Sequence, residues 1–191
     1  TWIELIAASL GALSVYLMTQ QKPAAWPIGL LMVLLYIWIF YDARLYSEML
    51  LQIIYVVLQI YGWWQWLRGG EQHQGRAVSR LNSLGISQGL LVGASITLAL
   101  GFAMSQYTDA NLPWLDAALT GFSLVAQYWM AQKRLQCWLL WIVLDSIYVG
   151  MFIAAELYLT AILYVVFTAL AVYGWLEWCT SEEQILWKLW C

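Results

Sequence analysis

The chain has 191 residues, of which 63% are hydrophobic and 10% are charged, and its formal net charge is −3. Soluble domains carry about 25% charged residues, so this composition excludes a water-soluble protein and indicates one embedded in a lipid bilayer. The weak net charge gives no indication of a nucleic-acid partner. Cys137, Cys179 and Cys191 form no C-x-x-C pair and His73 is the only histidine, so we expect no metal, haem or other cofactor.

Seven apolar stretches are long enough to cross a bilayer, which takes roughly 20 helical residues. In chain order we place them at about 3–20, 26–41, 46–67, 85–105, 114–132, 137–154 and 157–178. The first stretch lacks the basic flank and the cleavage site of a signal peptide, so we expect it to be retained. The one sizeable polar segment, 68–82, follows the third stretch and is typical of a flexible loop.

Lysine and arginine are distributed unequally between the two sides of the predicted membrane. One side holds Lys22, Arg68, Arg76, Arg80, Lys133, Arg134 and Lys188, and the other holds Arg44. Because basic loops stay in the cytoplasm, the N-terminus is expected outside and the C-terminus inside a bacterial cytoplasmic membrane.

The sequence repeats itself without gaps at an offset of 112 residues. Residues 2–66 and their counterparts share 16 identities in 65 positions, and these fall mostly on aromatic residues and glycine. Residues 1–67 and 113–179 are therefore predicted to be two three-helix repeats. Residues 68–112 supply a cytoplasmic loop and a linker helix, and residues 180–191 form a cytoplasmic tail.

Four helices from the first to the fifth restore the same direction across the membrane, so the two repeats are parallel. The predicted fold is an all-α membrane protein with seven transmembrane helices in a 3+1+3 parallel repeat, like that of the SWEET sugar carriers. Transporters of this architecture hold a small molecule near the midplane of the bilayer, between the repeats.

Positions at which one repeat is polar and the other is apolar indicate where an asymmetric ligand would bind. Asp145 and Trp141 stand opposite Val33 and Gly29, and Gln59 stands opposite Ala171. Together with deep aromatic residues on the same helical faces, these positions give a predicted substrate-binding set and no catalytic set. The set is Gln52, Tyr55, Gln59, Ser123, Gln127, Trp138, Trp141, Asp145, Tyr148 and Tyr164.

Each of these residue types also has a purely structural interpretation. In the functional interpretation, Asp145 is a counter-charge for a cationic ligand or a proton site. In the structural interpretation, it is a protonated acid or is hydrogen-bonded to a neighbouring Trp or Tyr. Gln52 and Gln59 could bridge helices by hydrogen bonds. Asp116 is expected to be solvated at the outer interface. An aromatic belt at the interfaces accounts for Trp2, Trp26, Trp63, Trp66, Trp114, Trp175 and Trp178.

Four motifs give the chain a family resemblance. They are Trp26, Pro27, Ile28 and Gly29; Tyr61, Gly62 and Trp63 through Trp66; Trp138, Leu139, Leu140 and Trp141 with Asp145; and Tyr158, Leu159, Thr160 and Ala161. In combination they resemble the PnuC family of bacterial vitamin carriers over essentially the whole chain. One departure is Ala25, where many relatives have Asn.

The resemblance implies facilitated diffusion of nicotinamide riboside across the cytoplasmic membrane. It also implies a homotrimer and a cytoplasmic kinase that traps the substrate by phosphorylation. Trp138, Trp141 and the polar faces of the third, fifth and sixth helices would surround the substrate. Close relatives carry thiamine or riboflavin, and riboflavin, being uncharged, would leave Asp145 less well explained.

Two other classes of protein fit the sequence less well. A membrane-embedded enzyme needs a paired nucleophile and base or a cluster of ligands, whereas the deep polar residues here include one carboxylate and no histidine. A receptor or purely structural protein would not need a repeat broken by buried polar residues.

Overall fold

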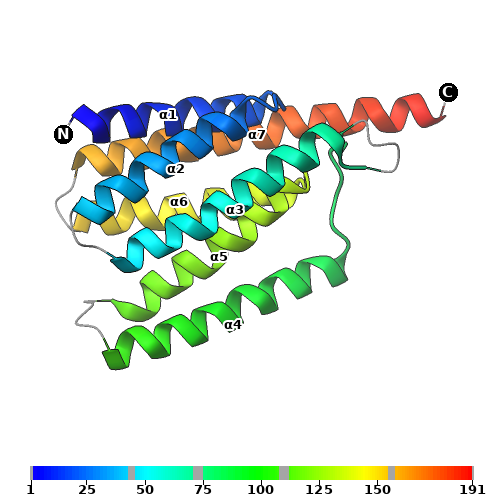
Figure 1. The fold of residues 1–191 in the computed structure, drawn as a ribbon. Helices are drawn as coiled ribbons and strands as arrows, with labels where there is room; N and C mark the ends of the chain where they lie inside the picture. Colours follow the sequence, from blue (N-terminus) through cyan, green and yellow to red (C-terminus); the bar gives the residue numbers. More distant parts are fainter. Residues whose placement is uncertain (1, 43–45, 71–74, 108–111, 155–157, 191) are drawn as a thin grey trace.

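The computed structural model describes residues 2–42, 46–70, 75–107, 112–154 and 158–190, which form seven α-helices (Figure 1). In chain order these are α1 (Trp2–Thr19), α2 (Ala25–Asp42), α3 (Tyr46–Arg68), α4 (Ser83–Tyr107), α5 (Pro113–Ala131), α6 (Gln136–Ala154) and α7 (Tyr158–Trp190). The first six begin and end within two residues of their predicted bounds.

The seventh helix is longer than predicted. It continues to Trp190 instead of ending at Trp178, and its last turns project beyond the rest of the bundle (Figure 1). Residues 180–190, predicted to be a tail, therefore extend the helix. The predicted membrane span ends where the sequence becomes less apolar. The helix itself continues, because no glycine or proline follows Gly174 to end it.

Six of the helices close into a ring, and α4 lies outside it (Figure 1). The packed neighbours around the ring are α1/α2, α2/α3, α3/α5, α5/α6, α6/α7 and α7/α1. The two contacts between repeats are α3/α5 and α7/α1. Replacing each helix by its counterpart in the other repeat turns one contact into the other, as a two-fold pseudo-axis requires. The predicted 3+1+3 parallel arrangement is thus confirmed, and among the described residues α4 packs on α5 alone.

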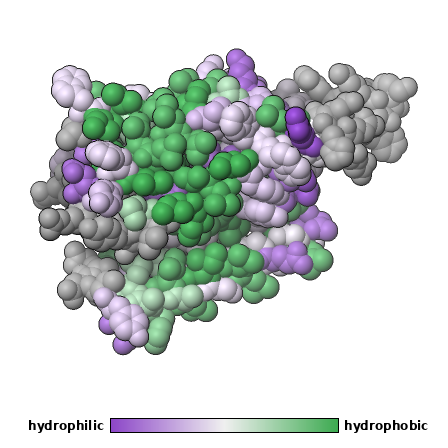
Figure 2. All heavy atoms as spheres, viewed as in Figure 1, coloured by the Kyte–Doolittle hydropathy of each residue, from purple (hydrophilic) through white to green (hydrophobic). Residues whose placement is uncertain are grey.

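The outer surface of the bundle suits a lipid environment. Figure 2 shows apolar residues across the middle of the molecule and polar residues toward its ends. By length and composition, Trp2–Thr19, Ser83–Tyr107, Gln136–Ala154 and Ala161–Glu183 can each cross a membrane, and Ala25–Ile39 is a shorter apolar helix. Helices α3 and α5 are less apolar because they carry Gln59, Ser123 and Gln127, which are buried inside the ring.

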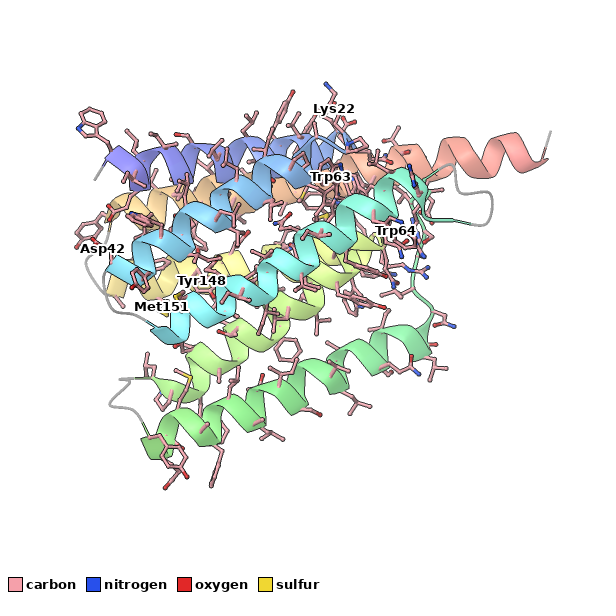
Figure 3. All side chains as sticks on the ribbon, viewed as in Figure 1. Lys22, Asp42, Trp63, Trp64, Tyr148 and Met151 are labelled. Carbon is pink, nitrogen blue, oxygen red and sulfur yellow. The ribbon has the colours of Figure 1, made fainter. Side chains whose placement is uncertain are left out.

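The cationic side chains that the structure describes gather at one end of the bundle. Asp42 lies at one end, and Lys22, Trp63 and Trp64 lie at the other (Figure 3). We call the latter the basic end, and among the described side chains it holds Lys22, Arg68, Arg76, Arg80, Lys133 and Arg134. Arg44, the cation predicted for the opposite end, lies outside the described residues, as does the side chain of Lys188.

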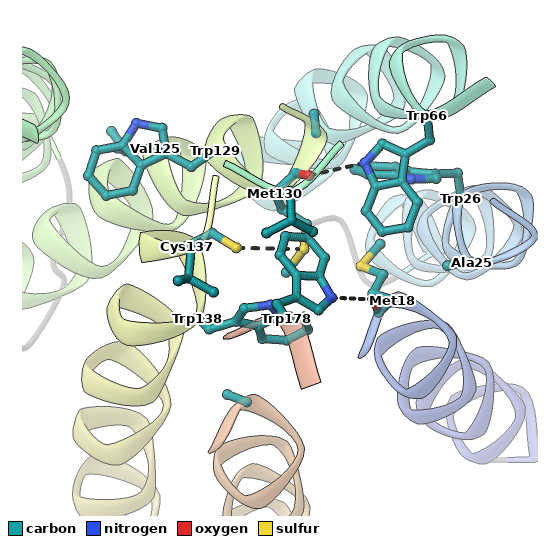
Figure 4. Packing of buried hydrophobic residues seen from close by; sticks show 14 residues of the cluster. Met18, Ala25, Trp26, Trp66, Val125, Trp129, Met130, Cys137, Trp138 and Trp178 are labelled. Atoms are coloured by element: carbon teal, nitrogen blue, oxygen red, sulfur yellow. Dashed lines mark hydrogen bonds between the residues drawn. The ribbon is translucent and has the colours of Figure 1, made fainter. Parts of the chain in front are cut away.

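Four tryptophans pack together where the repeats meet at the basic end (Figure 4). The ring centroids of Trp26 and Trp66 are 5.4 Å apart and those of Trp138 and Trp178 are 5.3 Å apart, each pair nearly perpendicular, at 79° and 87°. The prediction that Trp26, Trp66 and Trp178 belong to an interfacial belt is wrong, since they are at most 3% exposed. They bury large rings edge-to-face against one another, which is favourable in a packed core.

Two hydrogen bonds in this cluster cross between the repeats. The Trp66 indole donates to the Met130 carbonyl, and the Trp178 indole donates to the Met18 carbonyl, both at 3.1 Å (Figure 4). These bonds are equivalent under the offset of 112. Each repeat therefore uses the end of its last helix to hold the turn after the first helix of the other repeat.

Trp66→Phe and Trp178→Phe are expected to destabilise the protein by similar amounts, about 2–4 kcal/mol each, because each change removes one of the two equivalent indole donors and part of a buried ring. Thermal unfolding of the purified variants measures the effect. Trp63→Phe is the control, because Trp63 is 38% exposed. A large loss for one variant and none for the other would contradict the equivalence of the two contacts.

Part of the predicted flexible loop is held against the basic end. The Ser79 amide donates to the Lys133 carbonyl at 3.0 Å, and the Leu135 amide donates to the Ser79 carbonyl at 2.9 Å. Residues 71–74 of that loop lie outside the described residues. The segment that follows them covers the turn between α5 and α6, which buries Lys133 to 8% exposure.

Candidate functional site

A cavity of about 560 Å³ lies inside the ring, between the two repeats. This size lies within the roughly 300–1,000 Å³ of typical small-molecule sites. All ten residues of the predicted substrate-binding set line it: Gln52, Tyr55, Gln59, Ser123, Gln127, Trp138, Trp141, Asp145, Tyr148 and Tyr164. The structure thus brings together side chains from four helices, and their contact with a substrate stays a prediction.

The cavity lies on the pseudo-axis, because most of its lining residues come in pairs at the offset of 112. The pairs are Ala8/Thr120, Gly11/Ser123, Val15/Gln127, Met18/Met130, Val33/Asp145, Tyr36/Tyr148, Leu51/Leu163, Gln52/Tyr164, Tyr55/Phe167 and Gln59/Ala171. The predicted substrate-binding set included only one member of several pairs. It contained Gln127 and Tyr148 but missed their counterparts Val15 and Tyr36. The repeat itself could have found them, since the counterpart of a residue at an axial cavity also faces the axis.

Two carboxylates, Asp116 and Asp145, are the only charged side chains among the described residues that line the cavity. Asp145 is 6% exposed, and no described side chain donates a hydrogen bond to it. The structural interpretation that required a Trp or Tyr donor is therefore not supported. Asp116 was expected to be solvated but is half-buried at the cavity, because α5 begins at Pro113 and carries it inward.

Two residues that line the cavity each carry a buried polar atom with no partner in the described part of the chain. Gln59 Oε1 and Trp138 Nε1 are both buried and make no hydrogen bond. Buried polar atoms are nearly always paired, so an unpaired acceptor and an unpaired donor at a cavity favour a ligand that pairs them. The hydroxyls of Tyr55, Ser123 and Tyr148 lie near one another and add both donors and acceptors.

Aromatic rings from α6 and α7 form one wall of the cavity. The Tyr148 ring lies 4.9 Å from that of Tyr164 and 5.9 Å from that of Phe152, and the Tyr164 ring lies 5.5 Å from that of Phe167. Ring faces of this kind bind flat and cationic groups by stacking and cation–π attraction. The wall lies beside Asp145, so a planar cation would meet aromatic faces and a carboxylate at once.

Two parallel three-helix repeats closed around an axial cavity with polar groups in a largely apolar wall define a membrane transporter of small molecules. The family model described as nicotinamide mononucleotide transporter matches residues 1–180. The chain therefore belongs to this family, the PnuC family, and the resemblance seen in the sequence is confirmed. The family is one of transporters rather than enzymes.

Several characterised proteins are similar over nearly the whole chain. The nicotinamide riboside transporter PnuC of Escherichia coli is 28% identical, with 96% of this chain and 87% of that protein covered. Its namesake from Neisseria mucosa is 30% identical, with coverage of 93% and 72%. The riboflavin/roseoflavin transporter RibM of Streptomyces davaonensis is 25% identical, with coverage of 96% and 87%.

The fold also matches an experimental structure. The crystal structure of the vitamin B3 transporter PnuC superposes with a TM-score of 0.76 and 25% sequence identity, covering 96% of this chain and 83% of that one. The seven-helix arrangement described above is thus the arrangement of a solved transporter.

Proposed function

We propose that this protein carries nicotinamide riboside across the membrane. The observation that carries the proposal is the charge of the cavity, whose described lining includes Asp116 and Asp145 and no lysine, arginine or histidine. Nicotinamide riboside joins a flat pyridinium cation to a neutral ribose. The cation suits the carboxylates and the aromatic wall, and the ribose hydroxyls suit the amides and hydroxyls.

The same charge favours the riboside over its mononucleotide, which is the substrate that the family description names. The mononucleotide differs by one phosphate group, which is anionic at neutral pH. Placing that phosphate beside two carboxylates, with no cation in the described lining, costs both desolvation and repulsion. The names of the similar proteins from Escherichia coli and Neisseria mucosa agree with this preference.

Thiamine is the alternative substrate, because it also joins a flat cationic ring to a polar part. Riboflavin, which the name of the similar Streptomyces protein includes, is uncharged and would leave Asp145 buried without a counter-charge. We therefore consider riboflavin a less suitable substrate than nicotinamide riboside or thiamine.

A binding titration of the purified protein, followed by its tryptophan fluorescence, tests the proposal. Nicotinamide riboside is expected to bind at least about tenfold more tightly than either the mononucleotide or riboflavin, since one uncompensated charge is worth more than 1.4 kcal/mol in a buried site. Tighter binding of thiamine would make thiamine the substrate and would leave intact the proposal that the substrate is a cation. Tighter binding of the mononucleotide would overturn the proposal.

Trp141→Ala is expected to weaken nicotinamide riboside binding by about tenfold, because it removes one aromatic face from the cavity lining. The amount of protein inserted into the membrane should not change, since Trp141 is only half-buried and packs against the edge of the buried clusters. Titration of the variant together with its yield from membranes separates the two effects. Unchanged affinity would exclude Trp141 from the site.

The remaining features of the proposal concern the cell. We propose that the basic end faces the cytoplasm and that the N-terminus faces outward, which the positive-inside rule supports. The family resemblance supports facilitated diffusion, trapping by a cytoplasmic kinase, and a homotrimer in the bacterial inner membrane. A reporter fused to the C-terminus tests the orientation, and cross-linking in intact membranes tests the trimer.

A further inference from the structure

Lys133 places a buried positive charge where the two repeats meet. Its Nζ donates to Gln21 Oε1 at 3.3 Å and lies 4.7 Å from the centre of the Trp66 ring. Gln21 is the counterpart of Lys133 at the offset of 112, and both residues have positive φ, 54° and 50°. Two equivalent residues can touch only near the axis that relates them, so the Lys133 charge lies close to the pseudo-axis.

The same contact closes the cavity at the basic end. Met18 and Met130 line the cavity, and their carbonyls accept the hydrogen bonds from Trp178 and Trp66. Lys133 follows directly in the turn that begins with Met130. A substrate that leaves the cavity toward the basic end must separate these two turns, and with them the Lys133 side chain from its partners.

The closed arrangement compensates the Lys133 charge poorly. An ammonium group has three donors, and the described residues offer it one amide oxygen and one ring face, with no carboxylate within 4.0 Å. The neighbouring Arg134 is also a cation, and Glu182 is paired with Arg80. Burial lowers the pKa of Lys133 to about 8, in agreement with this geometry. Separation of the turns would return the ammonium to water.

We propose that the charge of Lys133 destabilises the closed basic end and thereby sets how readily the cavity opens there and releases its substrate. The identity of that substrate rests on the function proposed above, but the opening itself does not. The first repeat supplies a natural comparison, because Gln21 holds the same backbone conformation with an uncharged side chain. Lys133→Gln therefore removes the charge and places at this position a residue type that adopts the same positive φ at Gln21.

Cys137 reports the opening. It is fully buried in the tryptophan cluster, with its Sγ 3.8 Å from Met130 Sδ. With the other two cysteines replaced by serine, we expect Lys133→Gln to slow modification of Cys137 by a water-soluble maleimide by about tenfold. Lys133→Arg keeps the charge and should react at nearly the rate of the parent. Lys22→Gln removes an exposed cation from the same end and should have no effect.

Transport gives a second readout. In proteoliposomes, Lys133→Gln should slow exchange of nicotinamide riboside by a similar factor while its dissociation constant stays within about twofold, because Lys133 does not line the cavity. Faster Cys137 modification in Lys133→Gln, or a rate equal to that of Lys22→Gln, would overturn the proposal. If Lys133→Gln does not fold, Lys133→Met provides the same loss of charge. Failure of the parent to bind the riboside would refute the substrate, while the Cys137 rates would still decide the role of Lys133.

Discussion

Asp145→Asn is expected to weaken binding of nicotinamide riboside by at least about tenfold and to leave binding of its reduced, uncharged form within about twofold. Asp145 is 6% exposed and lacks a hydrogen-bond donor among the described side chains. A ligand cation would favour the ionised form of this carboxylate in a site with little water, where one charge pair is worth more than 1.4 kcal/mol. Fluorescence titration with the two forms of the same molecule measures the difference.

Asp116→Asn is the matched control for this prediction. It removes the other carboxylate of the cavity, but Asp116 is half-buried and stands near the start of α5, where water screens its charge more. Its loss should therefore weaken riboside binding less than loss of Asp145. Equal weakening of the charged and reduced forms by Asp145→Asn would show that Asp145 maintains the shape of the cavity rather than pairing with a cation.

Gly62→Ala is expected to prevent stable folding or to lower the melting temperature by many degrees. A Cβ at Gly62 would lie 2.2 Å from two ring atoms of Trp26, which is fully buried. Overpacking of this kind costs about 1–3 kcal/mol or more. Gly174→Ala should act in the same way, because its Cβ would lie 2.7 Å from the Trp138 ring.

Gly150→Ala is the control for both glycine variants. Gly150 lies within α6, and a Cβ there would meet nothing within 4 Å. Alanine favours a helix over glycine by about 1 kcal/mol, so this variant should be as stable as the parent or slightly more stable. Thermal unfolding of the three variants side by side gives the result. A Gly62→Ala protein with unchanged stability would contradict the packing of Trp26 against α3.

The sequence predicted the helices, their repeat and the ten cavity residues because each leaves a local signal. The length of an apolar stretch predicts a membrane span, and the offset of 112 predicts the repeat. A polar residue whose counterpart in the other repeat is apolar indicates a position at the cavity between the repeats. Asp145 and Gln59 were found in this way, and the structure places both at the cavity.

The misses have a different physical origin, since they depend on contacts between distant segments. Trp66 and Trp178 resemble interfacial tryptophans by their place at a helix end, and only the meeting of the two repeats buries them. Lys133 similarly belongs to a short basic turn, and its burial results from Gln21 and residues 75–82 closing over it. The helical continuation of α7 was missed because apolar length predicts membrane spans, not helix ends.

Counterflow in proteoliposomes tests the central claim most directly, that a cavity lined by carboxylates carries a cation and rejects its phosphorylated form. Vesicles loaded with unlabelled nicotinamide riboside should accumulate the labelled riboside. An excess of external unlabelled riboside should abolish this uptake, while the same excess of the mononucleotide leaves it nearly unchanged. Inhibition by the mononucleotide as strong as that by the riboside, or no uptake into loaded vesicles, would contradict the account.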